Sequence, residues 1–228
     1  IQCYAGMTRW LEGVPLGGYL ETPSGAAERI QLFSRIGELA AAMHNQAEGW
    51  ATPAGFTRPR LDNDGLLGEA PRWGRFWEHT ELTDAERQLL LQSRDKLRDS
   101  LDGYGESPDR FSLIHADMNA DNTIYNDGEL AIIDFDDSAY GWHMYDLAAA
   151  LIDETRASDF ATLRSAVLAG YCKYRPLTNN DVDQLDAFLL VRGMVTIGWF
   201  HQRPEHGDSE LFARLKDWVL ETCDATDW

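Results

Sequence analysis

The sequence is poor in lysine, with three in 228 residues and none before Lys96. Its first glycines after residue 10, Gly13, Gly17 and Gly18, lack the G-x-G-x-x-G spacing of a loop that covers nucleotide phosphates. These two absences exclude a complete phosphate-binding loop with its strand lysine from the 228 residues. We therefore expect these residues alone to perform phosphate chemistry poorly.

Cysteines and long apolar runs are also scarce. Cys3, Cys172 and Cys223 have neither metal-site nor disulfide spacing, so we expect reduced thiols. The longest apolar stretch, 188–200, contains Arg192 and is too short to cross a bilayer. No signal-peptide pattern is present. These features predict a cytoplasmic protein with no membrane partner.

Positive charge is the third scarcity: 20 Lys and Arg stand against 38 Asp and Glu, which gives a net charge of −18. Nucleic-acid phosphates are bound by dense basic surface, so the charge argues against a nucleic-acid partner. A negative cleft would suit a cationic substrate, although acidic surfaces more often serve solubility. Charge therefore does not choose the substrate, and nothing in the sequence fixes the oligomeric state.

Between residues 113 and 148, polar residues occur in a defined order and at defined spacings. His115, Asp117 and Asn122 follow the spacing H-x-D-x-x-x-x-N, and Asp134-Phe135-Asp136 begins twelve residues after Asn122. In phosphoryl transfer, an Asp in the first motif accepts the proton of the acceptor hydroxyl. The Asn and the later Asp hold the Mg²⁺ ions that bridge the phosphates. Each motif alone is weak, but their joint order and spacing predict a kinase-type catalytic loop.

A β-hairpin is predicted between the two motifs. Residues 122–125 are β-prone, 126–128 read Asn-Asp-Gly, and 130–133 read as a buried strand. Antiparallel pairing would place Asn122, entering the first strand, beside Asp134, leaving the second. An amide oxygen and a carboxylate could then share the metal ions, with water and phosphate completing their coordination.

Several neighbouring residues have weaker assignments. Asp136 is a candidate for a second metal ion, with a turn role as an equal alternative, whereas Asp121 and Asp137 are more typical of turns or ion pairs. His115 is expected to orient the loop through hydrogen bonds, and Arg192 to pair with a buried carboxylate. Five aromatic residues are candidates for the wall of an acceptor pocket, although core packing is more common: Trp73, Trp77, Trp142, Trp199 and Phe200.

The strings Ile-His-Ala-Asp at 114–117, Ile-Asp-Phe-Asp-Asp at 133–137 and Gly-Trp-His-Met-Tyr-Asp-Leu-Ala at 141–148 resemble the aminoglycoside phosphotransferase/choline kinase-like family. The last two are most similar to the branch of stress-response kinase A and homoserine-kinase-like proteins, as are 56–60 and 73–77. Ala116 stands where that family usually has Gly.

The resemblance implies ATP and Mg²⁺ as cofactors, Asp117 as catalytic base, and Asn122 and Asp134 as metal ligands. It also implies that Asp146 braces the catalytic loop from the next helix. Residues 8–13 resemble the hinge between two lobes, which implies that the Arg9 carbonyl and the Leu11 amide face the adenine.

The predicted fold class is α+β: a protein-kinase-like C-terminal lobe, mostly helical around a small catalytic β-hairpin. This lobe would cover residues 14–228, after the end of a small lobe and hinge in 1–13, with the rest of that N-terminal lobe absent. Helices are expected at 26–48, 84–101, 143–155, 158–174, 179–202 and 208–223. Thr83 and Thr178 are predicted to cap two of them. Residues 49–82 are expected to form a long irregular segment.

These patterns favour an ATP-dependent kinase that transfers the γ-phosphate to a hydroxyl of a small molecule or a protein, inactive without its small lobe. The alternative is a non-catalytic kinase-like binding or regulatory module. A metal-dependent hydrolase is a third hypothesis, but it would need further ligands, and the six histidines do not cluster.

Overall fold

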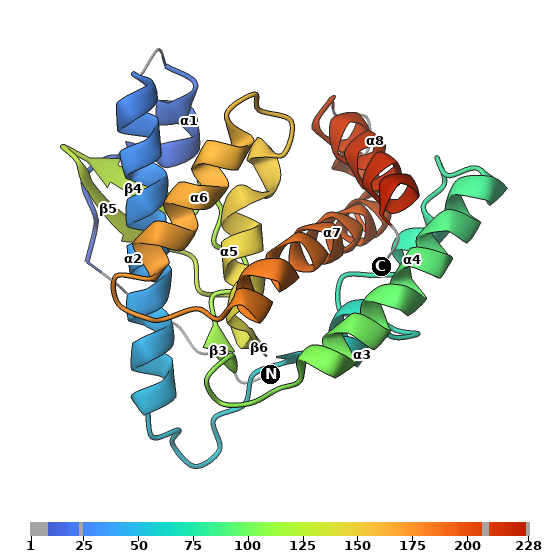
Figure 1. Ribbon diagram of the computed structural model, residues 1–228, viewed down its shortest axis with the longest axis horizontal. Helices are drawn as coiled ribbons and strands as arrows, with labels where there is room; N and C mark the ends of the chain where they lie inside the picture. The colour runs from blue at the N-terminus through green and yellow to red at the C-terminus, as the bar shows by residue number, and fades with distance from the viewer. Residues whose placement is uncertain (1–8, 23–24, 207–209, 227–228) are drawn as a thin grey trace.

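Helices make up most of the structure, and two small sheets accompany them (Figure 1). The computed structural model describes residues 9–22, 25–206 and 210–226. The α-helices are α1 (Leu16–Leu20), α2 (Ala26–Gly49), α3 (Asn63–Leu67), α4 (Asp84–Tyr104), α5 (His143–Leu151), α6 (Phe160–Tyr171), α7 (Asn179–His201) and α8 (Glu210–Ala225). Short 3₁₀ turns are η1 (Phe76–Glu78), η2 (Ile152–Glu154) and η3 (Pro204–His206). The mixed, mostly helical class predicted from the sequence is confirmed.

The predicted hairpin is formed by β4 (Thr123–Asn126) and β5 (Glu129–Ile132). Thr123 pairs with Ile132 and Asn126 with Glu129, so Asp127 and Gly128 alone make the turn. Both have positive φ, +47° and +86°, as a two-residue type I′ turn requires. β1 (Val14–Pro15) adds a third strand beside β4.

The sequence did not predict the second three-stranded sheet, which supplies the strand that leads into the loop at His115. β6 (Ala139–Trp142) pairs antiparallel with β3 (Phe111–Ile114) and parallel with β2 (Arg60–Leu61). β3 leads directly into His115, and β6 leads directly into α5. This sheet therefore sets the distance between the catalytic loop and the helix that follows it.

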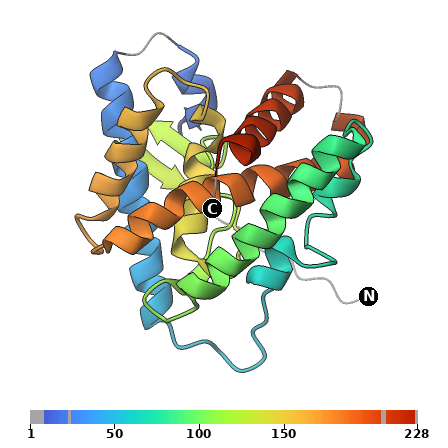
Figure 2. The ribbon, with the colours of Figure 1, turned by 45° about the vertical axis from the view of Figure 1, so that its right-hand side comes forward.

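The helices surround α5 and α7, which pack against each other at the centre (Figures 1 and 2). α2 and α6 lie side by side on one flank, and α4 lies on the opposite flank with α8 against it. Every residue of α5 is buried. Helices α2 and α6 pack against α5, and helices α4 and α8 pack against α7. An amphipathic helix buries its apolar face in such contacts.

Two helix starts follow the predicted chemistry. Thr83 and Glu86 form a reciprocal capping box at the start of α4, and Thr178 and Asp181 form another at α7. Both predicted caps are confirmed. α4 runs three residues further than expected, to Tyr104, whereas the helix expected at 143–155 ends at Leu151 and continues as η2.

The segment 49–82 is more ordered than predicted. It contains β2, α3 and η1, each too short to produce a periodic sequence pattern. The Asp62 side chain accepts a hydrogen bond from the Gly65 amide and so caps α3. Leu66, Leu67 and Phe76 are fully buried. Tertiary burial, rather than local periodicity, orders this segment.

α2 and α6 approach closely at two glycines. A Cβ on Gly37 of α2 would collide with the backbone carbonyl of Val167, and one on Gly170 of α6 with that of Ser34. The absence of both side chains lets the two helix backbones touch. The contact positions His44 of α2 and Tyr171 of α6, which meet in the core.

The first residue of α5, His143, is buried against another histidine. Its ring stacks on His44 with centroids 4.3 Å apart, and its Nε2 lies 2.8 Å from Oγ of Ser112. Burial, followed by the nearby His44 and Arg175, lowers the pKa of His143 to about 2. The folded protein therefore holds this ring in its neutral form throughout the physiological range.

Within the described ranges, no helix combines the length and the apolar character needed to cross a membrane. Cys172 is exposed and Cys223 is buried, and both are free thiols; Cys3 lies outside the described residues.

We predict that Gly170→Ala destabilises the protein by about 1–3 kcal/mol, because the new methyl group must push α6 away from α2. Gly103→Ala is the matched control, since that helical position faces open space and Ala is the better helix former. Urea denaturation of both variants measures the difference. Equal stability changes would contradict the close helix contact.

We also predict that His143 makes folding sensitive to acid. An unfolded histidine binds a proton near pH 6.5, whereas the folded one does so only near pH 2. Between these values acid favours the unfolded chain, so stability falls by up to about 1.4 kcal/mol per pH unit below pH 6.5. His143→Gln should flatten the free energy of unfolding between pH 6.5 and 5. Ser112→Ala, which keeps the ring, should retain the wild-type slope, and a His143→Gln variant with that same slope would refute the assignment.

Candidate active site

The catalytic loop is anchored by a buried carboxylate on α5. Asp146, with no exposed surface, accepts hydrogen bonds from the backbone amides of His115 (2.9 Å) and Ala116 (2.7 Å). His44 of α2 donates to the same carboxylate from Nε2 at 3.0 Å, and the Tyr171 hydroxyl of α6 donates to His44 Nδ1 at 2.9 Å. Three helices thus hold the start of the loop, as the bracing role expected of Asp146 requires.

Two opposing effects act on the ionisation of Asp146. Burial penalises its charged form, but the hydrogen bonds from His44 and from the His115 amide outweigh that penalty. Together they hold the pKa of Asp146 below its usual value. The carboxylate is therefore charged and acts only as an acceptor, which suits the N–H groups that surround it.

The loop backbone turns sharply at Ala116, whose φ is +70°. This left-handed conformation favours glycine and strains an L-residue by about 1–2 kcal/mol. It explains physically why Gly would be preferred at this position. The Ala116 amide on Asp146 and the Ala116 carbonyl, 3.3 Å from Arg192 Nη1, hold the strained turn in place.

His115 is buried and uses both ring nitrogens in backbone hydrogen bonds. Nε2 donates to the Ile133 carbonyl at 2.9 Å, and Nδ1 accepts from the Asp117 amide at 3.3 Å. The ring therefore ties the loop to the residue that follows β5. Since neither nitrogen is left for proton transfer, this geometry supports the loop-orienting role.

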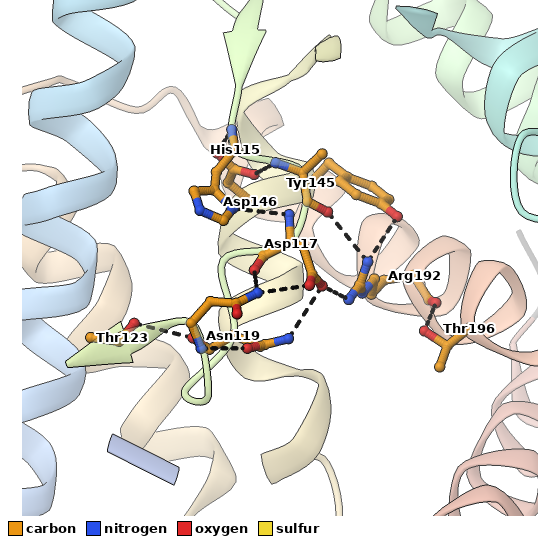
Figure 3. A network of polar contacts seen from close by, with 10 residues as sticks. His115, Asp117, Asn119, Thr123, Tyr145, Asp146, Arg192 and Thr196 are labelled. Atoms are coloured by element: carbon orange, nitrogen blue, oxygen red, sulfur yellow. Dashed lines mark hydrogen bonds and ion pairs between the residues drawn. The ribbon is translucent and has the colours of Figure 1, made fainter. Parts of the chain in front are cut away.

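The Asp117 carboxylate is held by three side chains (Figure 3). Asn122 Nδ2 donates to Oδ2 at 2.8 Å, and Asn119 Nδ2 donates to Oδ1 at 3.2 Å. Arg192 of α7 donates from Nη2 to Oδ1 as an ion pair. The prediction that Arg192 pairs with a carboxylate is confirmed, but that carboxylate is half-buried rather than buried, because it faces a cavity.

Asn122 and Asp134 are brought together by the hairpin backbone. Asn122 Nδ2 also donates to the Asp117 carbonyl at 2.9 Å, which leaves Oδ1 of Asn122 as an available acceptor. The Ile133 amide donates to the Asn122 carbonyl at 2.9 Å, so the strand pairing continues to the residue before Asp134. Among the described residues, no hydrogen bond joins the Asp134 carboxylate to Asn122 or Asp117.

This donor set fits a hard cation with few protein ligands. Asp134 is exposed and has φ +61°, which directs the chain out of the strand. One amide oxygen and one carboxylate at a solvent-facing edge match Mg²⁺, which keeps water and phosphate ligands. Over the described ranges, no three His, Cys, Asp or Glu side chains converge as an all-protein metal cage would need.

Asp136 is exposed. Its backbone carbonyl accepts a hydrogen bond from Nη1 of Arg58 at 3.0 Å. Its amide lies 3.4 Å from Oδ1 of Asp134. A metal role for Asp136 stays a prediction. Asp137 lies 3.8 Å from Arg72 as a half-exposed ion pair.

The predicted hinge residues border a cavity of about 360 Å³ beside the hairpin. Arg9, Trp10 and Leu11 face strands β4 and β5 across it. Trp10 is 81% exposed, so a planar apolar surface is available at the mouth. Thr8, the first residue of the expected hinge, lies outside the described residues.

A second cavity, of about 260 Å³, has Asp117 in its wall. Trp73, Trp199 and Phe200 line it, as predicted for an acceptor pocket. Trp77 and Trp142 do not line it. The remaining lining residues are Asn119, Asp121, Asp137, Ile152, Asp153, Arg192, Val195, Thr196, Leu211 and Leu215.

Sequence reasoning missed Asp153 and Asn119. Asp153 lies in η2, exposed at the cavity, with protein atoms close to its carboxylate. This loss of hydration, followed by the nearby carboxylates Glu154, Asp121 and Asp117, outweighs Arg192 and raises the pKa of Asp153. No spacing pattern marks this residue, because η2, α7 and α8 meet only in the folded chain.

Known proteins resemble this chain in sequence and in fold. The chain is 23% identical over 182 residues to the amicoumacin kinase of Bacillus subtilis strain 168, covering 75% of this chain and 51% of that protein. Its structure is similar to that of a microcompartment-associated aminopropanol kinase, with a TM-score of 0.74, 29% identity, and coverage of 85% of this chain and 60% of that one.

A third relative has the same fold. The structure of amicoumacin kinase hAmiN in complex with AMP-PNP, Ca²⁺ and Ami matches with a TM-score of 0.68 and 22% identity, covering 87% of this chain and 61% of that one. The chain thus spans about half the length of the curated relative and about three fifths of each structure. The model of the phosphotransferase enzyme family matches residues 2–188, most of the sequence, and the chain belongs to that family.

Proposed function

We propose that this protein transfers the γ-phosphate of ATP to a hydroxyl group of a small molecule. One observation carries the proposal: Asp117 stands in the wall of a cavity, on a loop fixed to the hairpin that presents Asn122 and Asp134. A base, two metal-ligand candidates and space for an acceptor therefore adjoin one another. The family and the relatives, which are small-molecule kinases, support the same reaction.

In this mechanism Asp117 orients the acceptor hydroxyl and takes its proton. The hydroxyl oxygen forms the new bond to the γ-phosphorus as the bond to the β-phosphate oxygen breaks and ADP leaves. Asn122 and Asp134 would hold Mg²⁺, which would supply charge compensation on the phosphates. His115 and Asp146 keep the loop in the geometry that the transfer needs. Most of the rate then comes from alignment.

The nucleotide is proposed to lie between the hairpin and residues 9–12, with the Arg9 carbonyl and the Leu11 amide toward the adenine. Residues 14–228 would form the larger lobe of a kinase-like fold. Because the 228 residues contain no G-x-G-x-x-G loop and no lysine before Lys96, we expect them to transfer phosphate poorly by themselves. The proposed activity is that of the full-length protein.

The cavity favours an acceptor that carries a positive charge. Asp121, Asp137 and Asp153 line it beside Asp117, and Trp199 and Trp73 offer aromatic faces. Carboxylates and aromatic rings are the groups that attract an ammonium ion. We therefore propose an amine-bearing alcohol as the acceptor class.

We predict that Asp117→Asn in the full-length protein lowers kcat by about 100-fold or more, since the amide cannot accept the hydroxyl proton. Its affinity for MgATP should stay near the wild-type value. Asp134→Ala should instead weaken nucleotide binding in the presence of Mg²⁺. A γ-phosphate transfer screen over small hydroxyl compounds, with nucleotide titration of each variant, measures both effects.

Two outcomes would contradict these roles. An Asp117→Asn variant with wild-type turnover would remove the base assignment, and an Asp134→Ala variant with unchanged MgATP affinity would remove the ligand assignment. Asp186→Asn, a surface change on α7, serves as the control and should alter neither value.

Acceptor binding is predicted to weaken in acid. Asp153 attracts an ammonium group only when ionised, and its pKa is raised, so protonation begins at a higher pH than for an ordinary Asp. KM for an amine-bearing acceptor should therefore rise as the pH is lowered. Asp153→Asn should raise KM by about tenfold, the equivalent of 1.4 kcal/mol, and remove that part of the pH dependence. Uncharged alcohols that are better acceptors than amines would sink this proposal.

A further inference from the structure

Among the described residues that line the acceptor cavity, Arg192 is the one cation, and the other charged ones are carboxylates. It belongs to α7, in a stretch of that helix whose neighbours Val191, Gly193 and Met194 are buried. Its side chain is only 12% exposed. A guanidinium in such surroundings loses most of its hydration, so it must be compensated by the groups it touches.

Those groups all belong to the catalytic loop and its support. Nη2 donates to Oδ1 of Asp117, and Nη1 lies 3.3 Å from both the Ala116 carbonyl and the Tyr145 hydroxyl (Figure 3). Burial lowers the pKa of Arg192, but Tyr145 and Asp117 more than offset it and raise the pKa above its usual value. The guanidinium is therefore permanently charged.

A single planar group thus holds both the side chain of Asp117 and the strained backbone before it. The two Nη atoms of arginine point in fixed directions, so they fix the Asp117 carboxylate relative to the Ala116 carbonyl. A lysine ammonium could make one of these contacts but has no such fork. Nε of Arg192 is buried and has no hydrogen-bond partner among the described residues. The contacts with the loop, and not with its own helix, therefore orient the guanidinium group.

The contacts also distinguish the two carboxylate oxygens. An ionised carboxylate oxygen accepts about two hydrogen bonds. Oδ1 of Asp117 already accepts from Arg192 and Asn119, whereas Oδ2 accepts from Asn122 alone among the described side chains. Oδ2 therefore keeps a lone pair for a further donor.

We propose, resting on the proposed kinase function, that Arg192 is a positioning residue which occupies Oδ1 of Asp117 and leaves Oδ2 to take the acceptor proton. In the reaction the hydroxyl proton moves to Oδ2, the hydroxyl oxygen bonds to the γ-phosphorus, and ADP departs. Arg192 stays on Oδ1 throughout and touches neither the proton nor the phosphate. Its effect is on the alignment of the base.

Substitution of Arg192 in the full-length protein tests this role. Arg192→Gln should lower kcat by about 100-fold, the loss that a misplaced catalytic group produces, while KM for MgATP stays unchanged. Arg192→Lys should recover little of that loss, because it restores the charge but not the fork. Arg164→Gln, which removes a surface arginine paired with Asp186, is the control and should keep wild-type kcat.

Chemical rescue separates positioning from a role in folding. Guanidinium ion added to Arg192→Ala should restore kcat saturably at low millimolar concentration and should not change Arg164→Ala. Arg192→Gln should also add little to the effect of Asp117→Asn, because both changes act through the same carboxylate. Melting temperatures of all variants are recorded alongside.

The outcomes distinguish this inference from the proposed function. A full-length wild-type protein that transfers phosphate to no acceptor overturns the function, and this inference with it. An active wild type with a fully active Arg192→Gln variant overturns the inference alone. So does a kcat loss that guanidinium fails to rescue and that parallels a fall in melting temperature.

Discussion

The candidate active site depends on one buried acceptor. Asp146 accepts hydrogen bonds from the amides of His115 and Ala116 on a loop whose backbone is otherwise strained, and the hydrogen bond from His44 helps to keep it charged in an apolar interior. Without this carboxylate the two amides would be buried without partners, and the turn at Ala116 would have little to hold it. The histidine and the tyrosine behind it come from α2 and α6, so the packing of distant helices is felt at the loop.

One cavity borders the hairpin, and a second cavity with different chemistry borders the loop. The cavity beside the hairpin has the exposed, apolar ring of Trp10 in its wall. On the side of α7, carboxylates and indole rings surround Asp117. Asp117, in the wall of this second cavity, accepts a hydrogen bond from Asn122 at the start of the hairpin.

Local patterns predicted the hairpin, both capping boxes and most helices, because turn and capping chemistry is encoded within a few residues. The resemblance to the family pointed to Asp117, Asn122, Asp134 and Asp146. The structure joins Asp117 to Asn122 by a hydrogen bond, whereas Asp134, one residue after the end of the strand pairing, has no hydrogen bond to either among the described residues. The second sheet and the order within 49–82 could not be read, since β2 has two residues and α3 five. Asp153 and the partner of Arg192 were hidden for a different reason: they depend on contacts between segments far apart in the sequence.

The glycine contact between α2 and α6 limits which substitutions the helices behind the loop can accept. Gly37 and Gly170 already let the two helices touch, and no residue is smaller, so mutation can only drive these helices apart. Trp199 and Leu211 in the cavity wall are partly exposed, so substitutions there can change the volume of the cavity with less cost to the core. Substrate preference can therefore drift on one side of the loop while the other side tolerates almost no variation.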